Sequence, residues 1–468
     1  MTTTLTFHGA AGTVTGSRHL LSTPAGNVLV DCGMFQGEKS LRERNWEKPP
    51  FNPAAVEAVL LTHAHIDHSG LLPRLFRDGF RGHVYATSAT CELAEILLRD
   101  AAKLQEEDAE YANRKGFSRH QPALPLFTEE DANAVLSRFR PVDYGERLTV
   151  AGLGVRFHNA GHILGSAHIE VALAGVSHTA VFSGDLGRYG VPLHRDPEPP
   201  PACDTLIMES TYGDRTHKES DLEQQLDEAL SATLANGGTV LVPAFAVARA
   251  QLLTLILGRL MGAGTIPHVP VHVDSPMAVD VTDVYRRYAN NLHLDDDISG
   301  GRGGTLFPAG VAFSRSIKES RALNDLKGPR VIISSSGMLT GGRVLHHLAR
   351  LAPVPGNLIL LAGYQAVGTR GRALMEGAQS IRLHGQDVVV RAAVAQLDGF
   401  SGHADAAELQ RWVESGASSP TTIFLVHGEP NATTVLRERL GRPGRTVVAP
   451  GMDYRFALVE GSGHWRAI

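Results

Sequence analysis

The segment VEAVLLTHAHIDH (residues 56–68) joins an apolar run to a hexapeptide, HAHIDH (63–68), that contains three histidines and an aspartate. The apolar run is typical of a buried strand, so the hexapeptide is expected in the loop that follows it. On a loop, alternate side chains can converge on two neighbouring points, which residues i and i+2 of a helix cannot do. Imidazole and carboxylate ligands suit Zn²⁺, with Mn²⁺ or Fe as alternatives. The segment therefore predicts a metal centre.

Further ligand candidates occur in two glycine-containing turns. NAGHILGSAH (159–168) supplies His162, and FSGDLG (182–187) supplies Asp185. A lone histidine after a strand usually fills surface or core space. Together with the HAHIDH segment, these turns bring ligand types to three places in one region, which favours a shared metal site instead.

Composition sets broad limits. A chain of 468 residues exceeds one ordinary domain of about 100–200 residues, so two domains are expected. No apolar stretch could span a bilayer, no secretory signal is visible, and three separated cysteines fit a reducing compartment, so we expect a cytoplasmic protein without a membrane partner. The net charge of -5 excludes a surface that is basic overall and binds nucleic acid through its whole area. It does not exclude a local groove lined with arginines.

The pattern of predicted strands and helices changes twice along the sequence. Residues 1–205 read as short strands separated by glycine with a few helices, and 206–390 alternate strands with long helices, which predicts a parallel sheet. Glycine-punctuated strands return in 391–468. One long insertion into a first domain explains the return. The proline-rich stretch 196–204 is interpreted as a stiff connector, and 110–127 as a loop beside a cleft.

HAHIDH with a later GH and SGD resembles the metallo-β-lactamase superfamily, in which the matching positions bind two metals. The resemblance implies an αββα sandwich, an α/β fold. It implies one zinc on His63, His65 and His162, a second on Asp67 and His68, and Asp185 as a bridge between them. Asp31 in LVDCG would orient ligands from behind. The flavin and di-iron relatives carry Glu at the position of His65, so hydrolysis is favoured.

Three later segments resemble the motifs of the β-CASP family, whose members cut nucleic acid: LIMESTYGDR (206–215), GFSGHAD (399–405) and LVHGEP (425–430). Together with DSPMA, ISSSGML and GYQAVGTRGR, they resemble bacterial and archaeal ribonucleases related to the endonuclease subunit of the mRNA 3′-end cleavage complex. The resemblance implies an inserted β-CASP domain with a mostly parallel sheet flanked by helices. It also implies that Glu209 supports a histidine, that His403 reaches the phosphate or leaving oxygen, and that His427 completes the second metal site.

An RNA substrate requires phosphate contacts. SSSGM (334–338) follows a strand and precedes a helix, so its backbone N–H groups are candidates to hold an anion at a helix start. The candidate residues are Ser334, Ser335, Ser336, Gly337, Thr369, Arg370, Arg372 and Arg249. Each arginine could equally be a structural ion-pair partner, and SSSG an ordinary turn.

The expected reaction is hydrolysis of single-stranded RNA in a cleft between the domains, with two Zn²⁺ per chain, or Mn²⁺ in their place. A metal-bridging hydroxide, oriented by Asp67, would attack the phosphate, while His403, supported by Glu209, assists the departing 3′ oxygen. The products would be 5′-phosphate and 3′-hydroxyl ends. An endonuclease acting in RNA processing is expected, with a 5′-to-3′ exonuclease mode open.

Three alternatives are also compatible with the sequence. A hydrolase of small esters, thioesters or lactones would leave the insertion unexplained, and an inactive RNA-binding subunit would normally have lost metal ligands. A DNA nuclease of the same fold is compatible with the chemistry, which uses no ribose 2′-hydroxyl. Whether the protein is a monomer or a homodimer is left open.

Overall fold

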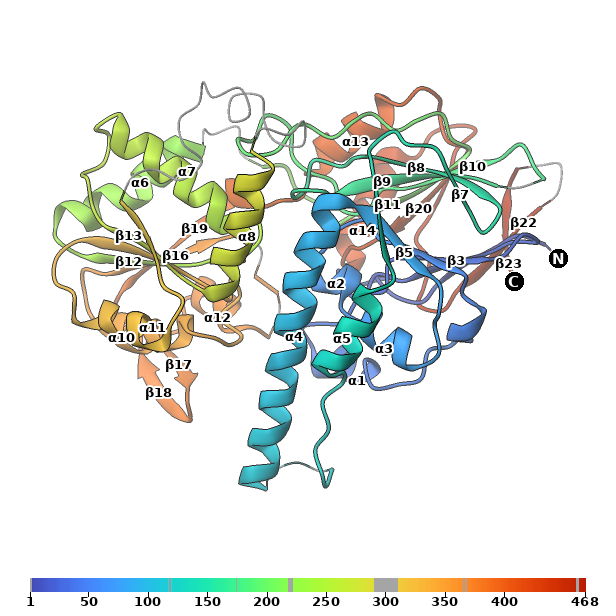
Figure 1. Cartoon of the computed structure of the whole chain (residues 1–468). Helices are drawn as coiled ribbons and strands as arrows, with labels where there is room; N and C mark the ends of the chain where they lie inside the picture. The colour runs from blue at the N-terminus through green and yellow to red at the C-terminus, as the bar shows by residue number, and fades with distance from the viewer. Residues whose placement is uncertain are drawn as a thin grey trace. The chain divides into compact units, whose positions relative to one another are not determined.

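The chain forms two compact units. The computed structural model describes residues 2–116, 118, 120–173, 175–217, 222–289, 310–363, 365–366, 368–459 and 463–468. The first unit contains Met1–Gly190, Asp196–Thr216 and His403–Ile468, and the second contains Val191–Arg195 and His217–Gly402. The first unit therefore includes the blue N-terminal and red C-terminal segments in Figure 1.

One sheet of the first unit has eight strands in the order β23-β22-β1-β2-β3-β4-β5-β6. Its strands are β1 (Thr4–Phe7), β2 (His19–Ser22), β3 (Asn27–Val30), β4 (Ala58–Leu60), β5 (His83–Thr87), β6 (Phe139–Val142), β22 (Arg455–Leu458) and β23 (Trp465–Ala467). From β3 to β6 the strands are parallel. Parallel neighbours end at the same edge, so β3 and β4 deliver the residues that follow them to one place.

The other sheet has seven strands in the order β21-β20-β11-β10-β9-β8-β7. Its strands are β7 (Leu148–Val150), β8 (Leu153–Asn159), β9 (Ala167–Ala172), β10 (Thr179–Phe182), β11 (Thr205–Glu209), β20 (Thr422–Val426) and β21 (Thr446–Val448). β9 runs antiparallel to both β8 and β10, while β10, β11 and β20 are parallel. The C-terminal ends of β8, β10, β11 and β20 therefore share one edge.

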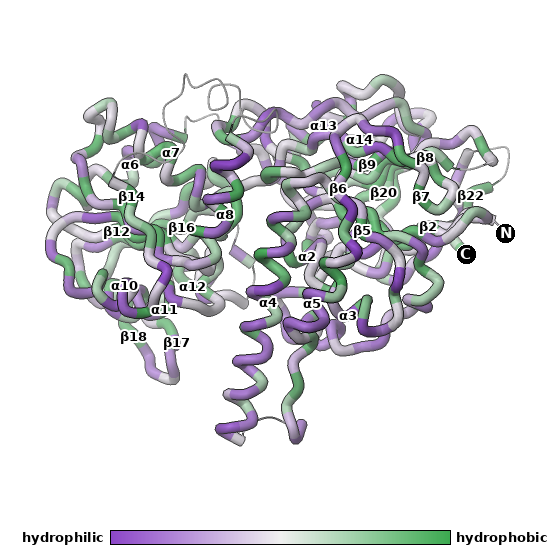
Figure 2. Tube along the Cα trace, viewed as in Figure 1, coloured by the Kyte–Doolittle hydropathy of each residue, from purple (hydrophilic) through white to green (hydrophobic). Residues whose placement is uncertain are grey.

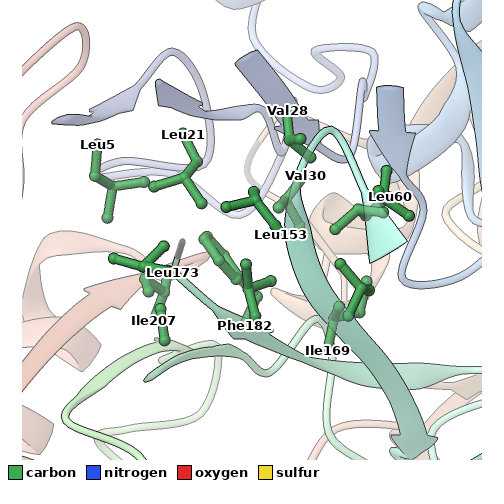
Figure 3. Close-up of a cluster of buried hydrophobic side chains, with 14 of the residues drawn as sticks. Leu5, Leu21, Val28, Val30, Leu60, Leu153, Ile169, Leu173, Phe182 and Ile207 are labelled. Atoms are coloured by element: carbon green, nitrogen blue, oxygen red, sulfur yellow. The ribbon is translucent and has the colours of Figure 1, made fainter. Parts of the chain in front are cut away.

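The two sheets pack face to face through one hydrophobic core. β8 alternates buried and more exposed residues, which is the pattern of a strand with one face on a core. Figure 3 labels Leu5, Leu21, Val28, Val30 and Leu60 from the eight-stranded sheet, and Leu153, Ile169, Leu173, Phe182 and Ile207 from or beside the seven-stranded sheet. Each fully buried side chain of this kind stabilises the fold by about 1.5–3 kcal/mol.

Helices cover the outer faces of the first unit, which completes the predicted αββα sandwich. They are α1 (Lys39–Arg44), α2 (Ile66–Ser69), α3 (Leu72–Arg77), α4 (Ser88–Lys115), α5 (Glu129–Leu136), α13 (Ala406–Glu414) and α14 (Pro430–Leu440), with a 3₁₀ turn at Pro53–Ala55. α4 contacts β5 and β6, and α14 contacts β20 and β21. Figure 1 shows α4 as the longest helix, and Figure 2 shows that its C-terminal part is mainly hydrophilic.

The second unit contains a six-stranded sheet in the order β14-β13-β15-β12-β16-β19. The strands are β12 (Thr239–Pro243), β13 (Val271–Asp274), β14 (Val311–Phe313), β15 (Arg330–Ser334), β16 (Leu358–Ala362) and β19 (Ala393–Leu397), all paired in parallel. Every residue of β12, β15 and β16 is buried, as expected where helices cover both faces. The predicted parallel sheet is confirmed.

The helices of the second unit are α6 (Leu222–Ala235), α7 (Arg249–Gly262), α8 (Pro276–Arg287), α10 (Ile317–Ala322), α11 (Val344–Leu351) and α12 (Arg370–Met375), with 3₁₀ turns at Leu323–Asp325 and Asp398–Phe400. Figure 1 shows α6 and α7 on one side of the sheet and α11 and α12 on the other. A small antiparallel hairpin, β17 (Ser380–Leu383) and β18 (Gln386–Val389), follows α12.

The unit boundaries follow strand pairing. β11 was expected to open the inserted domain, but it pairs with β10 and β20, so the second unit begins at His217. β19 was expected beyond the insertion, but it pairs with β16, so the second unit extends to Gly402.

The segment 110–127, interpreted as a loop, begins inside a helix. α4 extends to Lys115 and ends at Gly116, which adopts a left-handed conformation with φ of 67°. Glycine takes this conformation without steric cost, and it commonly terminates helices. Among the described residues, no helix combines the length and apolar character needed to cross a membrane.

Candidate metal centre

The HAHIDH segment follows β4 and continues into α2, so it is only partly a loop. His63, Ala64 and His65 belong to no helix or strand, whereas Asp67 and His68 belong to the single helical turn α2, which begins at Ile66. Residues after β3 hold this turn in place, because the amide of Cys32 donates to the His68 carbonyl at 2.7 Å. A Cβ on Gly33 would lie 1.6 Å from the Asp67 carbonyl oxygen, so only glycine allows this approach.

The first ligand group consists of His63, His65, His162 and Asp185. Nε2 of His63 lies 3.1 Å from Nδ1 of His65, and Nε2 of His162 lies 3.3 Å from the same atom. Oδ2 of Asp185 lies 3.5 Å from Nε2 of His63 and 3.6 Å from Nε2 of His162. The turns after β4, β8 and β10 thus meet at one point.

The second ligand group consists of Asp67, His68 and His427. Nε2 of His427 lies 3.2 Å from Nε2 of His68 and 3.5 Å from Oδ2 of Asp67. Asp185 also faces this group, since its Oδ1 lies 3.2 Å from Nε2 of His68. The carboxylate of Asp185 therefore presents one oxygen to each group.

The donor atoms fit metal ions. Imidazole nitrogens 3.1–3.3 Å apart match the edge of about 3.3 Å in a tetrahedron whose metal–nitrogen distance is about 2.0–2.1 Å. Among the described residues, Oδ1 of Asp185 is buried and accepts no hydrogen bond, which is costly for a carboxylate without a cation. The pKa of Asp185 is held well below its usual range, because the neighbouring histidines outweigh the effect of burial.

Hydrogen bonds behind the ligands set their orientation. Nδ1 of His68 lies 2.7 Å from Oδ2 of Asp31, and Asp31 accepts from the amide of Thr62 at 2.8 Å. The hydroxyl of Thr211 donates to the His427 carbonyl and so accepts from Nδ1 of His427, at 3.1 Å. Both arrangements leave Nε2 as the ligand atom.

Thr62 and Thr211 were not singled out from the sequence. Their only signal is adjacency, since Thr62 precedes His63, and Thr211 lies two residues after Glu209 in ESTYG. Asp405 caps α13, because its Oδ1 accepts from the amides of Ala407 and Glu408.

His403 and Glu209 form a pair beside the first ligand group. Nδ1 of His403 lies 3.0 Å from Oε2 of the fully buried Glu209, whose Oε1 accepts from the Leu186 amide. Burial alone would lower the pKa of His403, but the charges of Glu209 and Asp185 raise it to about 9. The His403 ring lies 4.7 Å from the His162 ring, and the His403 side chain is 18% exposed. A protonated His403 is therefore accessible to a substrate.

The expected RNA-contact residues all lie in the second unit. Ser334 ends β15 and donates to the Asp274 carbonyl, and Ser335 donates to Ser275 at 3.0 Å. The hydroxyls of Ser336 and Thr340 are 2.9 Å apart. α11 begins only at Val344, so SSSGM does not form a helix start as expected; residues up to Arg343, including two glycines, intervene.

The remaining candidates also contact their own unit. Thr369 caps α12 by accepting from the Arg372 amide, and Arg372 pairs with Glu376 at 2.6 Å. Arg370 donates to the carbonyls of Arg382 and Leu339. Arg249 is buried at the first turn of α7, and Gly337 is buried where a Cβ would meet Phe245. Phosphate binding by these residues stays a prediction.

Parts of this chain are similar to known protein families. Three family descriptions match: the metallo-β-lactamase superfamily over residues 15–242, the β-Casp domain over 250–374, and the Zn-dependent metallo-hydrolase RNA specificity domain over 387–450. A solved structure of a protein of unknown function from Enterococcus faecalis V583 aligns with 98% of this chain and 100% of that one, at a TM-score of 0.54 and 15% identity, which is a likeness of fold alone.

Curated relatives are closer in sequence. Ribonuclease TTHA0252 of Thermus thermophilus is 40% identical over 441 residues, covering 94% of this chain and 96% of that protein. The RNase J-like protein of Methanocaldococcus jannaschii is 33% identical over 432 residues, covering 91% and 92%. Transcription termination factor FttA of the same organism is 32% identical over 438 residues, and this chain spans 67% of its length. A chain that aligns from end to end with such relatives and carries all three matching domains in order belongs to the β-CASP family of the metallo-β-lactamase superfamily.

Proposed function

We propose that the protein is a zinc-dependent ribonuclease that hydrolyses single-stranded RNA and leaves 5′-phosphate and 3′-hydroxyl ends. The observation that carries this proposal is the carboxylate of Asp185, whose oxygens face two separate groups of histidines. His63, His65, His162 and Asp185 would hold one ion, and Asp67, His68, His427 and Asp185 the other. Bound metal ions would activate water and offset negative charge on the scissile phosphate.

The protein's own side chains would position and protonate the reacting groups. Asp67 is partly exposed beside His427, where its carboxylate can accept a hydrogen bond from the attacking water. His403, kept protonated by Glu209, would donate its proton to the departing 3′ oxygen. Glu209 would act only through His403, because it is completely buried.

RNA is the favoured substrate for two reasons. The C-terminal residues match a family described by its RNA specificity, and two of the curated relatives above are named as ribonucleases. We assign phosphate contacts to the second unit, at Ser334, Ser335, Ser336, Gly337, Thr369, Arg370, Arg372 and Arg249. Internal cleavage is the proposed mode, and removal of nucleotides from the 5′ end is the alternative.

The test uses the full-length protein and a 5′-labelled single-stranded RNA, read at nucleotide resolution. Wild type, Asp67→Asn and Asp387→Asn are compared with added Zn²⁺ or Mn²⁺, and a DNA of the same sequence and a chromogenic ester are run in parallel. Asp387 is 68% exposed on the β17–β18 hairpin, so its variant controls for the substitution itself.

We expect internal RNA fragments from the wild type and Asp387→Asn, and strongly reduced cleavage by Asp67→Asn. Release of labelled mononucleotide alone would replace the internal mode with the 5′-end mode. Preference for DNA or the ester, or no RNA cleavage by a folded protein with both metals bound, would contradict the proposal.

A further inference from the structure

The turn that follows Glu209 is fastened to the segment that carries His403. Within this turn the amide of Arg215 donates to the Tyr212 carbonyl at 3.3 Å. Tyr212 forms a parallel bridge with Asp405, and the Arg215 carbonyl accepts from the Ala406 amide at 3.0 Å. The positions of Tyr212 and Arg215 are thus fixed relative to His403, two residues before Asp405.

The side chain of Tyr212 contacts both His403 and Arg215. The rings of Tyr212 and His403 are 6.1 Å apart in an edge-to-face geometry, and Tyr212 is only 5% exposed. The guanidinium carbon of Arg215 lies 5.1 Å from the centroid of the Tyr212 ring, and the Arg215 side chain is 52% exposed. Tyr212 therefore connects the partly exposed His403 to a cation at the surface.

Hydrogen bonds to Asp214 also fix the orientation of the Arg215 guanidinium group. Asp214 accepts from Nε of Arg215 at 3.0 Å and from Nη2 at 3.4 Å, and Asn431 donates to Asp214 at 2.9 Å. Gly213 allows the turn to lie against α14, since a Cβ there would be 2.5 Å from the Ala432 carbonyl oxygen. An arginine oriented in this way loses little conformational entropy when it binds a phosphate.

We propose that Arg215 binds the RNA phosphate next to the scissile one on its 5′ side. This role rests on the ribonuclease function proposed above. His403 is assigned to the departing 3′ oxygen, which belongs to the nucleotide on the 5′ side of the cut. Tyr212 contacts both His403 and Arg215, so we place Arg215 beside the part of the RNA that carries this oxygen. A guanidinium matches a phosphate in geometry and charge.

A purely structural role for Arg215 predicts something different. An exposed ion pair contributes only about 0–1 kcal/mol to stability, so closing the turn does not require a cation here. Under that role, replacing Arg215 would change thermal stability slightly. Any effect of the replacement on RNA cleavage would not depend on the charge of one particular phosphate. The chemistry of the substrate can therefore separate the two roles.

The experiment follows cleavage of one chosen bond in a labelled RNA on a gel. The substrate is either all-phosphate, or carries a neutral methylphosphonate one linkage to the 5′ side or one linkage to the 3′ side of that bond. Wild type, Arg215→Ala, Arg215→Lys and Arg99→Ala are compared. Arg99 is the matched control, because its side chain is also 52% exposed and pairs with a carboxylate, that of Glu95.

We expect Arg215→Ala to lower kcat/KM on all-phosphate RNA by roughly ten- to a hundredfold, the equivalent of one charge-assisted hydrogen bond, mainly through KM. The loss should disappear when the 5′ linkage is neutral and persist when the 3′ linkage is neutral. Arg215→Lys should fall between wild type and Arg215→Ala, whereas Arg99→Ala should match the wild type. Metal content and melting temperature should stay unchanged.

Two results would overturn this role in different ways. If the wild type cuts RNA and Arg215→Ala loses the same factor on all three substrates, or loses nothing, the role of Arg215 fails alone. If the folded, metal-loaded wild type cuts no RNA, the ribonuclease function fails and the role fails with it.

Discussion

Nδ1 of His68 lies 2.7 Å from Oδ2 of Asp31, and both side chains are almost completely buried. The contact leaves Nε2 of His68 facing His427 and Asp185. Asp31 follows β3, whereas His68 belongs to the turn after β4, so pairing between these two strands aligns the carboxylate with the imidazole. The orientation of this ligand is thus a product of the sheet.

Asp31→Asn should weaken binding of one metal ion by about 10- to 100-fold, because a neutral amide holds the imidazole less firmly and lowers its basicity. Competition with a chromogenic chelator measures this affinity, with Asp387→Asn as the control. Equal affinities for the variant and the wild type would show that Asp31 has no influence on the ligand.

Asp185→Ala and Asp67→Ala should differ in metal content. Asp185 faces both ligand groups, so its loss should reduce occupancy of both sites, whereas loss of Asp67 should leave the group around His63 intact. Elemental analysis of the purified variants gives the metal-to-protein ratio. The same ratio in both variants would argue against a bridging Asp185.

His403→Gln should lower kcat by about 10²- to 10⁴-fold while leaving metal content unchanged. As an acid, His403 works only when protonated, so wild-type activity should fall as the pH rises through about 9. Glu209→Gln removes the nearest charge that raises the pKa of His403, so the fall should move to lower pH. A pH–rate profile for each protein tests this, and an unmoved alkaline limb in Glu209→Gln would reject the assignment.

His19 should make the fold sensitive to acid. Burial, followed by the charges of His68 and His427, lowers its pKa from 6.5 to about 3. Between these two pKa values the unfolded chain takes up a proton that the folded chain does not. The contribution of neutral His19 to the free energy of unfolding is therefore fully present above about pH 6.5. It is lost as the pH falls towards 3, by about 1.4 kcal/mol per pH unit. Urea unfolding at pH 7.5 and pH 5 should show a smaller difference in His19→Leu than in the wild type. Substitution of the exposed His268 by Leu should leave the difference unchanged.

The architecture was predictable because its signals are local. The apolar run before HAHIDH, the glycine-flanked turns and the alternation of strands with helices each mark an element directly, and all the expected metal ligands converge in the first unit. His162 and Asp185 were grouped because each stands in a glycine-containing turn, whereas His427 was assigned to the site through the family resemblance.

Other features depend on distant pairing. Nothing in TLIME (205–209) indicates that β11 pairs with a strand more than two hundred residues later, so the unit boundary at His217 was not predictable. The roles of Thr62 and Thr211 depend on hydroxyl directions that only the packed structure defines. The helix after SSSGM could have been placed correctly, because the Gly341–Gly342 pair argues against helix before Arg343.

The ligands of this centre are unevenly spread along the chain. His63 to Asp185 precede the second unit, whereas His403 and His427 follow it, and His427 reaches the site only when β20 pairs with β11. A ribosome that has made the first two hundred residues has produced the first ligand group but neither His403 nor His427. If these residues act as proposed, a nascent chain would be unable to cut RNA until its synthesis is nearly finished, which would protect the message that encodes it.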